Sequence, residues 1–187
     1  MKEIIFLIGF RAVGKTTIGR ALADRLGFAF IDTDLLICEK KGATVKAIVQ
    51  AEGWDGFRRC EQEVLRGLVD QRRCVIATGG GAVLHQHLWP LLKKHGHVVW
   101  LAAEPDIICQ RIQADSASDT LRPSLSGKAV CAEVREILAL REPLYRETAD
   151  IIVDTGKLSV PEILDKIITN YELRITNYEL RITNYEL

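Results

Sequence analysis

The sequence predicts an α/β fold in which about five strands form a parallel sheet flanked by helices. Short apolar runs rich in β-branched residues alternate with longer segments whose apolar residues recur at helical spacing. Two of these runs are followed immediately by glycine, which is typical of strands that end in tight turns. The chain has 187 residues, a length that suits one domain with a substantial core.

The expected strands are short, and their apolar character is continuous rather than alternating. Ile4–Ile8 is the clearest of them, and Gly9 ends it. A parallel strand that is covered on both faces shows this pattern. The remaining strands are expected at Phe28–Ile31, Cys74–Thr78, Val98–Leu101 and Ile151–Val153.

Helical periodicity is clearest after the first strand. Ile18, Leu22 and Leu26 recur within Lys15–Leu26, and Gly27 stands where a helix C-cap is expected. Further helices are expected over Leu35–Lys41, Thr44–Glu52, Phe57–Asp70, Pro105–Gln113 and Ala132–Leu140, with Arg141 at a helix end and Pro161 opening the last helix.

Two segments differ from this pattern. Residues 114–127 are polar and aperiodic, so we expect a mobile lid within a single domain that spans residues 1–167. Residues 168–187 repeat the unit ITNYELR, and the third copy lacks its final residue. Units this short cannot form a solenoid, so we interpret the tail as a helix extension or a disordered segment produced by duplication.

Composition excludes several classes of protein. Lys plus Arg number 25 and Asp plus Glu number 25, and this balance predicts no general attraction to nucleic acid or to an anionic membrane. The run Ile4–Ile8 is too short for a signal peptide or a membrane span, so we expect a cytoplasmic protein. Its five widely spaced cysteines favour reduced thiols over a disulfide framework. The two His-x-His pairs lack further ligands for a metal site.

The motif Gly-x-x-x-x-Gly-Lys-Thr at residues 9–16 indicates a phosphate-binding loop, because it follows a predicted strand and opens a predicted helix. Its backbone N–H groups and the helix dipole favour phosphate. We expect Lys15 to reach the β- and γ-phosphates of ATP and the Thr16 hydroxyl to coordinate Mg²⁺. The nucleotide contacts are expected at Ala12, Val13, Gly14, Lys15, Thr16 and Thr17.

Carboxylates and glycines follow the next two strands. Asp32 and Asp34 could divide the work of holding Mg²⁺ and accepting a proton, although a helix N-cap with a solvated partner is the alternative. Gly79, Gly80 and Gly81 permit close approach of a ligand to the backbone, or they form a plain turn. Arg58, Arg122 and Arg141 are either solvated surface residues or bidentate clamps for carboxylate and phosphate.

The order of these segments resembles that of shikimate kinases, which belong to the nucleoside-monophosphate-kinase-like group. The matching segments run in the family's order from about residue 3 to about residue 165: GFRAVGKTTIGRALA, FIDTD, GFRRCE, IATGGG, LRPSLSG, REPLYRETA and VDT. The resemblance implies ATP-dependent phosphorylation of the shikimate 3-hydroxyl in aromatic amino-acid biosynthesis. The partners that it implies are ATP and shikimate, with Mg²⁺ as the cofactor.

The resemblance also implies roles for individual residues. Thr16 and Asp32 hold the magnesium ion, and Asp34 meets the acceptor hydroxyl. Arg58 and Arg141 grip the shikimate carboxylate, with help from the backbone of Gly79 to Gly81. Arg122 is the lid arginine over the ATP phosphates, Arg111 is a second arginine on the nucleotide side, and the loop after Asp154 borders adenine with Lys157. Together with Lys15, Asp34 and Arg122 form the expected catalytic set.

The chain departs from the family pattern in three places. The family commonly has Gly where Ala12 stands and Met or another residue where Arg11 stands, and Ala12 fits without strain only if its φ is negative. The tail repeat has no counterpart in the family. Two other functions stay open, a kinase for another small hydroxy acid such as gluconate and a nucleotide-binding switch without chemistry. We expect a monomer, with the tail as the candidate segment for self-association.

Overall fold

The computed structural model describes residues 3–114 and 129–183, and over this part of the chain the expected α/β fold is confirmed. Five strands form one parallel sheet in the order β2-β3-β1-β4-β5. Each strand lies within two residues of its expected range. The strands are β1 (Ile4–Ile8), β2 (Ala29–Asp32), β3 (Cys74–Ala77), β4 (Gly96–Ala102) and β5 (Ile151–Asp154).

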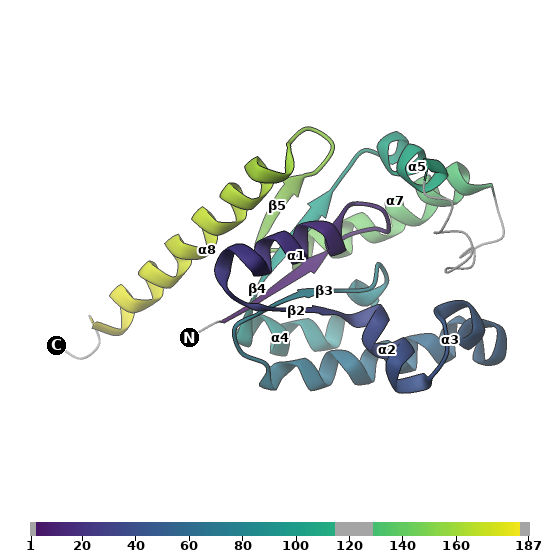
Figure 1. Ribbon diagram of the computed structural model, residues 1–187, viewed down its shortest axis with the longest axis horizontal. Helices are drawn as coiled ribbons and strands as arrows, with labels where there is room; N and C mark the ends of the chain where they lie inside the picture. The colour runs from purple at the N-terminus through teal and green to yellow at the C-terminus, as the bar shows by residue number, and fades with distance from the viewer. Residues whose placement is uncertain (1–2, 115–128, 184–187) are drawn as a thin grey trace.

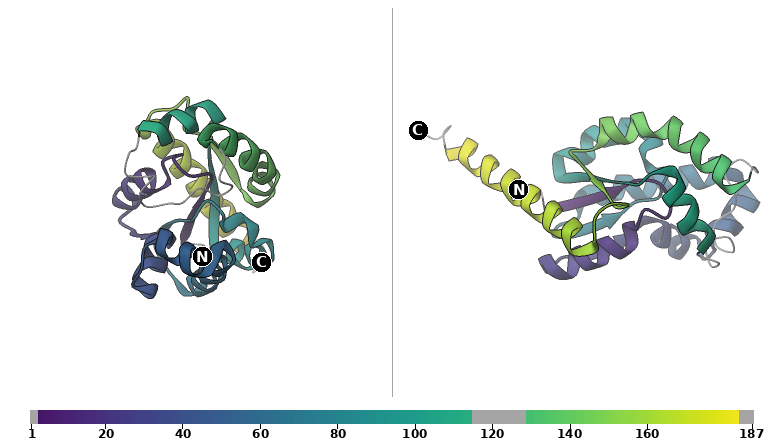
Figure 2. Two further views of the ribbon diagram at one scale, coloured as in Figure 1. Left: turned by 90° about the vertical axis from the view of Figure 1, so that its right-hand side faces the viewer. Right: turned by 90° about the horizontal axis from the view of Figure 1, so that it is seen from above.

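Helices cover both faces of the sheet (Figures 1 and 2). On one face lie α1 (Lys15–Leu26) and α8 (Val160–Thr183), and on the other lie α4 (Trp89–His95) and α7 (Val130–Thr148). At the carboxyl edge of the sheet, α2 (Thr33–Lys41) packs against α3 (Val45–Arg66), and α5 (Pro105–Ala114) packs against α7. Coverage on both faces explains why all five residues of β1 are buried and why that strand is apolar throughout.

Strand register brings the expected site residues to one edge. Leu7 of β1 pairs with Ala77 of β3 and with Val99 of β4, and Asp32 of β2 also pairs with Ala77. The chain therefore leaves β1, β2 and β3 at the same level. The phosphate loop, Asp32 and the triple glycine follow these strand ends, so they meet at the carboxyl edge, where ligands of open parallel sheets bind.

Two helices expected here form one element, α3, in place of separate helices at Thr44–Glu52 and Phe57–Asp70. This element ends at Arg66, and a short 3₁₀ segment follows at Gly67–Asp70. Gly53 interrupts the helical backbone with φ 70° and ψ 178°. The expected gap therefore corresponds to a kink rather than a loop. Positive φ suits glycine because it has no Cβ. Across the kink, α2 and α3 share a small core of Ile37, Val45, Ile48, Phe57, Cys60 and Val64.

The expectation that a helix ends at Arg141 is wrong, because α7 continues to Thr148 with Pro143 inside it. Proline normally removes a helical hydrogen bond and ends the helix. Here Leu138, Arg141 and Tyr145 are buried along one face of α7, and this tertiary packing outweighs the local preference. Two short elements were not expected, the 3₁₀ segments Ala82–Leu84 and Gln86–Leu88.

The first copy of the tail repeat continues α8 and packs on the domain. Tyr171 is 5% exposed, and its ring meets that of Phe28 edge to face with centroids 6.4 Å apart. Arg174 lies 3.2 Å from a carboxylate oxygen of Asp150. The packed part of the chain therefore extends beyond the expected boundary at residue 167, and α8 then projects past the sheet (Figures 1 and 2).

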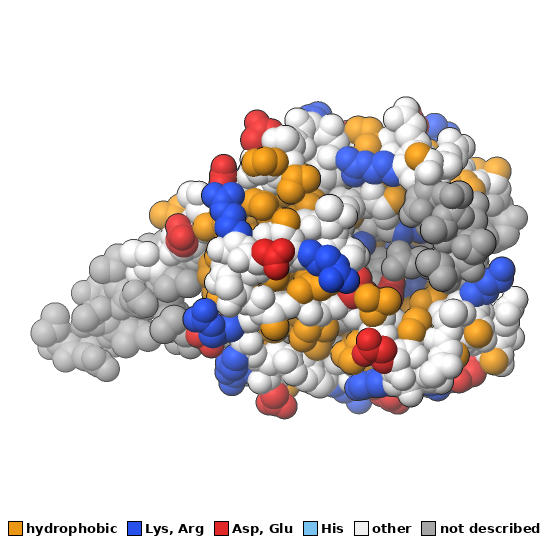
Figure 3. Space-filling view, in the orientation of Figure 1, with side chains coloured by type: hydrophobic (Ala, Val, Ile, Leu, Met, Phe, Trp, Pro, Cys, Tyr) orange, Lys and Arg blue, Asp and Glu red, His pale blue; other side chains and the backbone are white. Residues whose placement is uncertain are grey.

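The surface agrees with the balanced composition. Figure 3 shows acidic and basic side chains interspersed over the described part of this face, without a broad area of one sign. None of the helices in the described ranges has the length and apolar character needed to cross a membrane.

Candidate active site

The phosphate loop runs from the end of β1 to the start of α1. Gly9 and Gly14 have φ values of 141° and 93°, which lie in the region that favours glycine. The ammonium group of Lys15 donates to the carbonyl oxygens of Gly9 at 2.8 Å and Phe10 at 2.7 Å. Lys15 is thus folded along the loop, close to where phosphate oxygens would approach the N-terminus of α1.

Ala12 does not meet the condition for a fit without strain, because its φ is +62°. An L-residue with a Cβ is disfavoured in the left-handed region by roughly 1–2 kcal/mol. The carbonyl oxygen of Ala12 accepts a hydrogen bond from Arg111 Nη1 at 3.4 Å. This residue therefore keeps the loop conformation at a cost that glycine would avoid.

Thr16 and Asp32 lie side by side. The Thr16 hydroxyl donates to Asp32 Oδ2 at 2.9 Å, while Asp32 Oδ1 accepts from the backbone N–H groups of Asp34 at 3.1 Å and Leu35 at 3.4 Å. Asp32 is therefore the N-cap of α2 and a neighbour of the phosphate loop at once. A hydroxyl and a carboxylate are hard oxygen donors that fit Mg²⁺, which keeps most of its coordination for water and substrate phosphates. The described residues contain no group of three or more His, Cys, Asp or Glu side chains able to hold a metal ion.

A cavity opens next to the phosphate loop at the carboxyl edge of the sheet. Its charged lining combines arginines from three elements with two carboxylates, and aromatic side chains close one wall. The structure thus brings Asp34, Arg58, the triple glycine and Arg141 together around one cavity. The lining residues are Phe10, Arg11, Asp34, Val45, Trp54, Phe57, Arg58, Glu61, Gly79, Gly80, Gly81 and Arg141.

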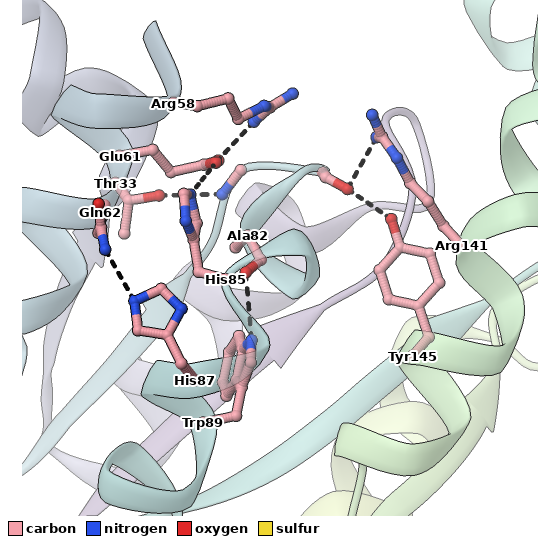
Figure 4. Close-up of polar contacts among 12 residues, drawn as sticks. Thr33, Arg58, Glu61, Gln62, Ala82, His85, His87, Trp89, Arg141 and Tyr145 are labelled. Carbon is pink, nitrogen blue, oxygen red and sulfur yellow. Dashed lines mark hydrogen bonds and ion pairs between the residues drawn. The ribbon is translucent and has the colours of Figure 1, made fainter. Parts of the chain in front are cut away.

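The triple glycine is more than a plain turn, because two of its members lie against charged side chains. A Cβ on Gly79 would lie 2.5 Å from Glu61 Oε1 and 2.6 Å from Asp34 Oδ1, and a Cβ on Gly81 would overlap the guanidinium of Arg58. The loop is fixed to α2 because the Gly79 N–H donates to the Thr33 hydroxyl at 2.9 Å (Figure 4). The absence of side chains therefore lets both carboxylates and an arginine approach the loop.

Arg141 and Tyr145 reach the same loop from α7. Arg141 Nη1 donates to the carbonyl oxygen of Gly80 at 3.0 Å, and the Tyr145 hydroxyl donates to the same oxygen at 2.6 Å (Figure 4). Tyr145 is 1% exposed and stacks on Trp100 with centroids 5.6 Å apart. Burial lowers the pKa of Arg141, and the positive charge of Arg58 lowers it further. Burial also raises the pKa of Tyr145 to about 12, so its hydroxyl keeps its proton.

Arg58 is held by a carboxylate one helical turn along α3. Its Nη1 donates to Glu61 Oε2 at 2.6 Å, and its guanidinium lies over the rings of Trp54 and Phe57 at 5.4 and 5.6 Å. Burial alone would raise the pKa of Glu61. Hydrogen bonds from His85 and Arg58 outweigh that effect, so the pKa lies below its usual range. The Glu61 side chain is therefore negatively charged although it is buried.

On the nucleotide side, Arg111 bridges the phosphate loop and the loop after β5. Besides Ala12, its guanidinium contacts the hydroxyl of Thr155 at 3.1 Å and its carbonyl oxygen at 2.7 Å. Lys157 pairs with Asp154 at 3.0 Å. Arg122 and the expected lid, apart from Ala114, lie outside the described residues.

Sequence reasoning missed several residues that shape the site. Glu61 was readable in principle, because it stands three residues after Arg58 on a predicted helix. Tyr145 and His85 gave no such local signal. Arg11 appeared only as a departure from the family, yet it lines the cavity and pairs at 2.7 Å with the buried Glu133 of α7.

A phosphate loop that borders a cavity lined by three arginines and two carboxylates is the site of a P-loop phosphotransferase for a small anionic alcohol. A family model described as "Shikimate kinase" matches residues 11–172, and the chain belongs to the shikimate kinase family.

Curated relatives carry the same name. A shikimate kinase of Syntrophus aciditrophicus (strain SB) is 45% identical over 176 residues, which cover 90% of each chain. A shikimate kinase 2 of Yersinia enterocolitica is 42% identical over 90% of this chain and 95% of its own.

Solved structures agree. The shikimate kinase from Acinetobacter baumannii, determined in complex with shikimate, has a TM-score of 0.82 at 36% identity and covers 94% of each chain. The enzyme from Bacteroides thetaiotaomicron has a TM-score of 0.80 at 29% identity and covers 90% of this chain and 98% of its own. A gluconokinase from Sinorhizobium meliloti is only 14% identical, with a TM-score of 0.55 over 96% of this chain and 97% of its own, and shares the fold alone.

Proposed function

We propose that this protein transfers the γ-phosphoryl group of ATP to the 3-hydroxyl of shikimate, which yields ADP and shikimate 3-phosphate. The observation that carries the proposal is the convergence of Arg58, Arg141 and Asp34 around the Gly79–Gly81 loop, beside the phosphate loop. A carboxylate on the acceptor suits two guanidinium groups. Asp34 suits the acceptor hydroxyl as the group that accepts its proton.

The chain's own residues would act mainly by positioning and charge. Lys15 would leave the carbonyl oxygens of Gly9 and Phe10 for the β- and γ-phosphates, and Arg111 would border the base. Thr16 and Asp32 would hold Mg²⁺, which when bound neutralises phosphate charge. Arg122 would approach the phosphates from the lid. We expect these steps to occur in a cytoplasmic monomer.

A kinase for gluconate is the nearest alternative, and a nucleotide switch without chemistry is the other. A switch has no use for a cavity in which Asp34 faces the same loop as two arginines. Release of ADP, measured by a coupled assay with shikimate, gluconate and no acceptor, separates the three possibilities. Turnover with shikimate alone supports the proposal, and equal rates with and without an acceptor contradict it.

Substitution of the arginines tests the acceptor site directly. Arg58→Ala and Arg141→Ala should each weaken shikimate binding by about 2–5 kcal/mol, the usual loss when one partner of a desolvated charge pair is removed. ATP affinity should change little. Arg59→Ala is the matched control, because Arg59 is the neighbouring residue on α3 and is exposed. Calorimetry that finds weakened ATP and unchanged shikimate binding would show that the assignment of these arginines is wrong.

A further inference from the structure

His85 lies between the two 3₁₀ segments Ala82–Leu84 and Gln86–Leu88, which follow the triple glycine, and local hydrogen bonds fix its direction. The Leu84 N–H donates to Gly81 O at 2.9 Å, and the His85 N–H donates to Ala82 O at 3.2 Å. The same Ala82 oxygen accepts from Trp89 Nε1 at 3.1 Å. This folded segment turns the imidazole of His85 away from solvent, so that its side chain is 10% exposed, and points it at α3 (Figure 4).

The imidazole and the substrate-side arginine meet on a single atom. Glu61 Oε2 lies 3.0 Å from His85 Nε2 and 2.6 Å from Arg58 Nη1. Because Glu61 is buried and ionised, it can only accept hydrogen bonds. His85 Nε2 is therefore the donor in this hydrogen bond, which determines the tautomer of a neutral ring. Two donors on one oxygen hold the plane of the carboxylate more firmly than Arg58 alone would.

The orientation of Glu61 matters on its other side as well. Its second oxygen, Oε1, and Asp34 Oδ1 both lie within 2.6 Å of the point where a Cβ on Gly79 would stand. A rotation of Glu61 would move negative charge relative to Asp34 and release Arg58 from its place beside Gly81. Glu61 therefore needs a fixed plane for both the carboxylate clamp and the proton acceptor to keep their positions.

We propose that His85 is a positioning residue of the acceptor site: it holds Glu61, and Glu61 holds Arg58 in the geometry that receives the acceptor's carboxylate. This inference rests on the proposed shikimate kinase activity and names a further residue for it. His85 is not among the residues that line the acceptor cavity. Its effect should therefore appear in the affinity for shikimate, with much smaller effects on ATP and on the chemical step.

The chain offers a close control two residues away. His87 also links the 3₁₀ region to α3, but its Nε2 lies 2.7 Å from Gln62 Nε2 rather than near Glu61, and the residue is exposed. Both histidines are drawn in Figure 4. A substitution at His87 removes a bridge between the same two elements without touching the carboxylate that holds Arg58.

The experiment compares four full-length variants by steady-state kinetics with shikimate and ATP varied in turn. His85→Leu fills the space but cannot donate, and the KM for shikimate should rise roughly tenfold or more, the effect expected for one lost hydrogen bond to a charged group. His85→Gln places an amide donor near the position of Nε2, and the KM should return to within about threefold of the parent value. His85→Asn is too short to reach Glu61 and should behave like His85→Leu, so it serves if the leucine variant does not fold. His87→Leu should leave all constants unchanged.

The outcomes separate this inference from the function on which it rests. If the parent chain fails to phosphorylate shikimate, the proposed function is wrong. If the parent is active and His85→Leu or His85→Asn keeps the parent KM, the positioning role is wrong. Equal rises in the KM values for ATP and shikimate, or the same rise in His87→Leu, would mean that His85 only stabilises the fold in general. Either result would overturn the proposal. A rise confined to shikimate that glutamine reverses supports it.

Discussion

Gly81→Ala places a methyl group where the guanidinium of Arg58 now lies. The backbone of Gly81, with φ −99° and ψ −1°, can be adopted by alanine, so the substitution adds no backbone strain. Its Cβ would overlap Nη1, Cζ and Nη2 of Arg58. That end of the arginine is flexible, but Glu61 Oε2 holds it at 2.6 Å. The predicted result is therefore a displaced arginine in a folded protein.

The magnitude follows from what Arg58 is expected to contribute. Complete loss of one partner of a desolvated charge pair is worth about 2–5 kcal/mol, and displacement rather than removal should cost about 1.5–3 kcal/mol of shikimate binding. That corresponds to roughly 10- to 150-fold in affinity. Calorimetric titration with shikimate and then with ATP measures the split. Gly67→Ala is the control, because Gly67 has φ −74° and ψ −6° and nothing lies within 4 Å of its added Cβ. Unchanged shikimate affinity in Gly81→Ala would refute the placement of the carboxylate beside this arginine.

Three further predictions concern other parts of the chain. Lys15→Ala should lower turnover by several orders of magnitude, because its charge gains value as phosphoryl charge develops, and near-normal single-turnover rates would contradict the phosphate-loop mechanism. A chain ending at Tyr171 should keep nearly full activity and lose only about 0–1 kcal/mol of stability. The truncation removes the ion pair between Asp150 and Arg174, whose side chain is 44% exposed. A loss above about 2 kcal/mol in a thermal melt would show that the later repeats dock on the domain. Asp150→Asn should destabilise the protein by about 1.5–3 kcal/mol at neutral pH. Although burial alone would raise the pKa of Asp150, the adjacent imidazole of His97, the hydrogen bond from the Val98 N–H and the charges of Arg174 and Lys93 hold it below its ordinary 3.8. The stability that Asp150 contributes is therefore present above about pH 4 and lost as the pH falls further, so denaturant curves of parent and variant should converge in acid.

The parts of the site that could be predicted are those whose residues stand together in the sequence. The phosphate loop, the Asp32–Asp34 segment and the triple glycine each follow a strand, so recognition of the strands placed all three at one edge. The link between Glu61 and His85 joins residues 24 positions apart, and no periodicity reports such a contact. Pro143 was misleading for the opposite reason, because its local preference is real but the burial of Tyr145 and its neighbours on α7 outweighs it. The positive φ of Ala12 could not be predicted from the residue either, because the conformation of the whole loop sets it.

The charges of the acceptor cavity explain why its ligand should be an anion. Glu133 pairs with Arg11, and Glu61 pairs with Arg58, so two of the three arginines that line the cavity already have a carboxylate. Arg141 donates to the neutral carbonyl oxygen of Gly80, and burial together with the charge of Arg58 lowers its pKa. A lowered pKa on an arginine means that its charged form is under-stabilised where it stands. A carboxylate bound between Arg141 and Arg58 would supply the missing negative charge, whereas a neutral polyol would leave this cost in place. Discrimination between shikimate and an uncharged analogue should therefore weaken more in Arg141→Ala than in Arg58→Ala. The arginine left in Arg141→Ala is Arg58, which already has Glu61 as a partner, whereas the arginine left in Arg58→Ala is Arg141, which still needs the negative charge of the ligand.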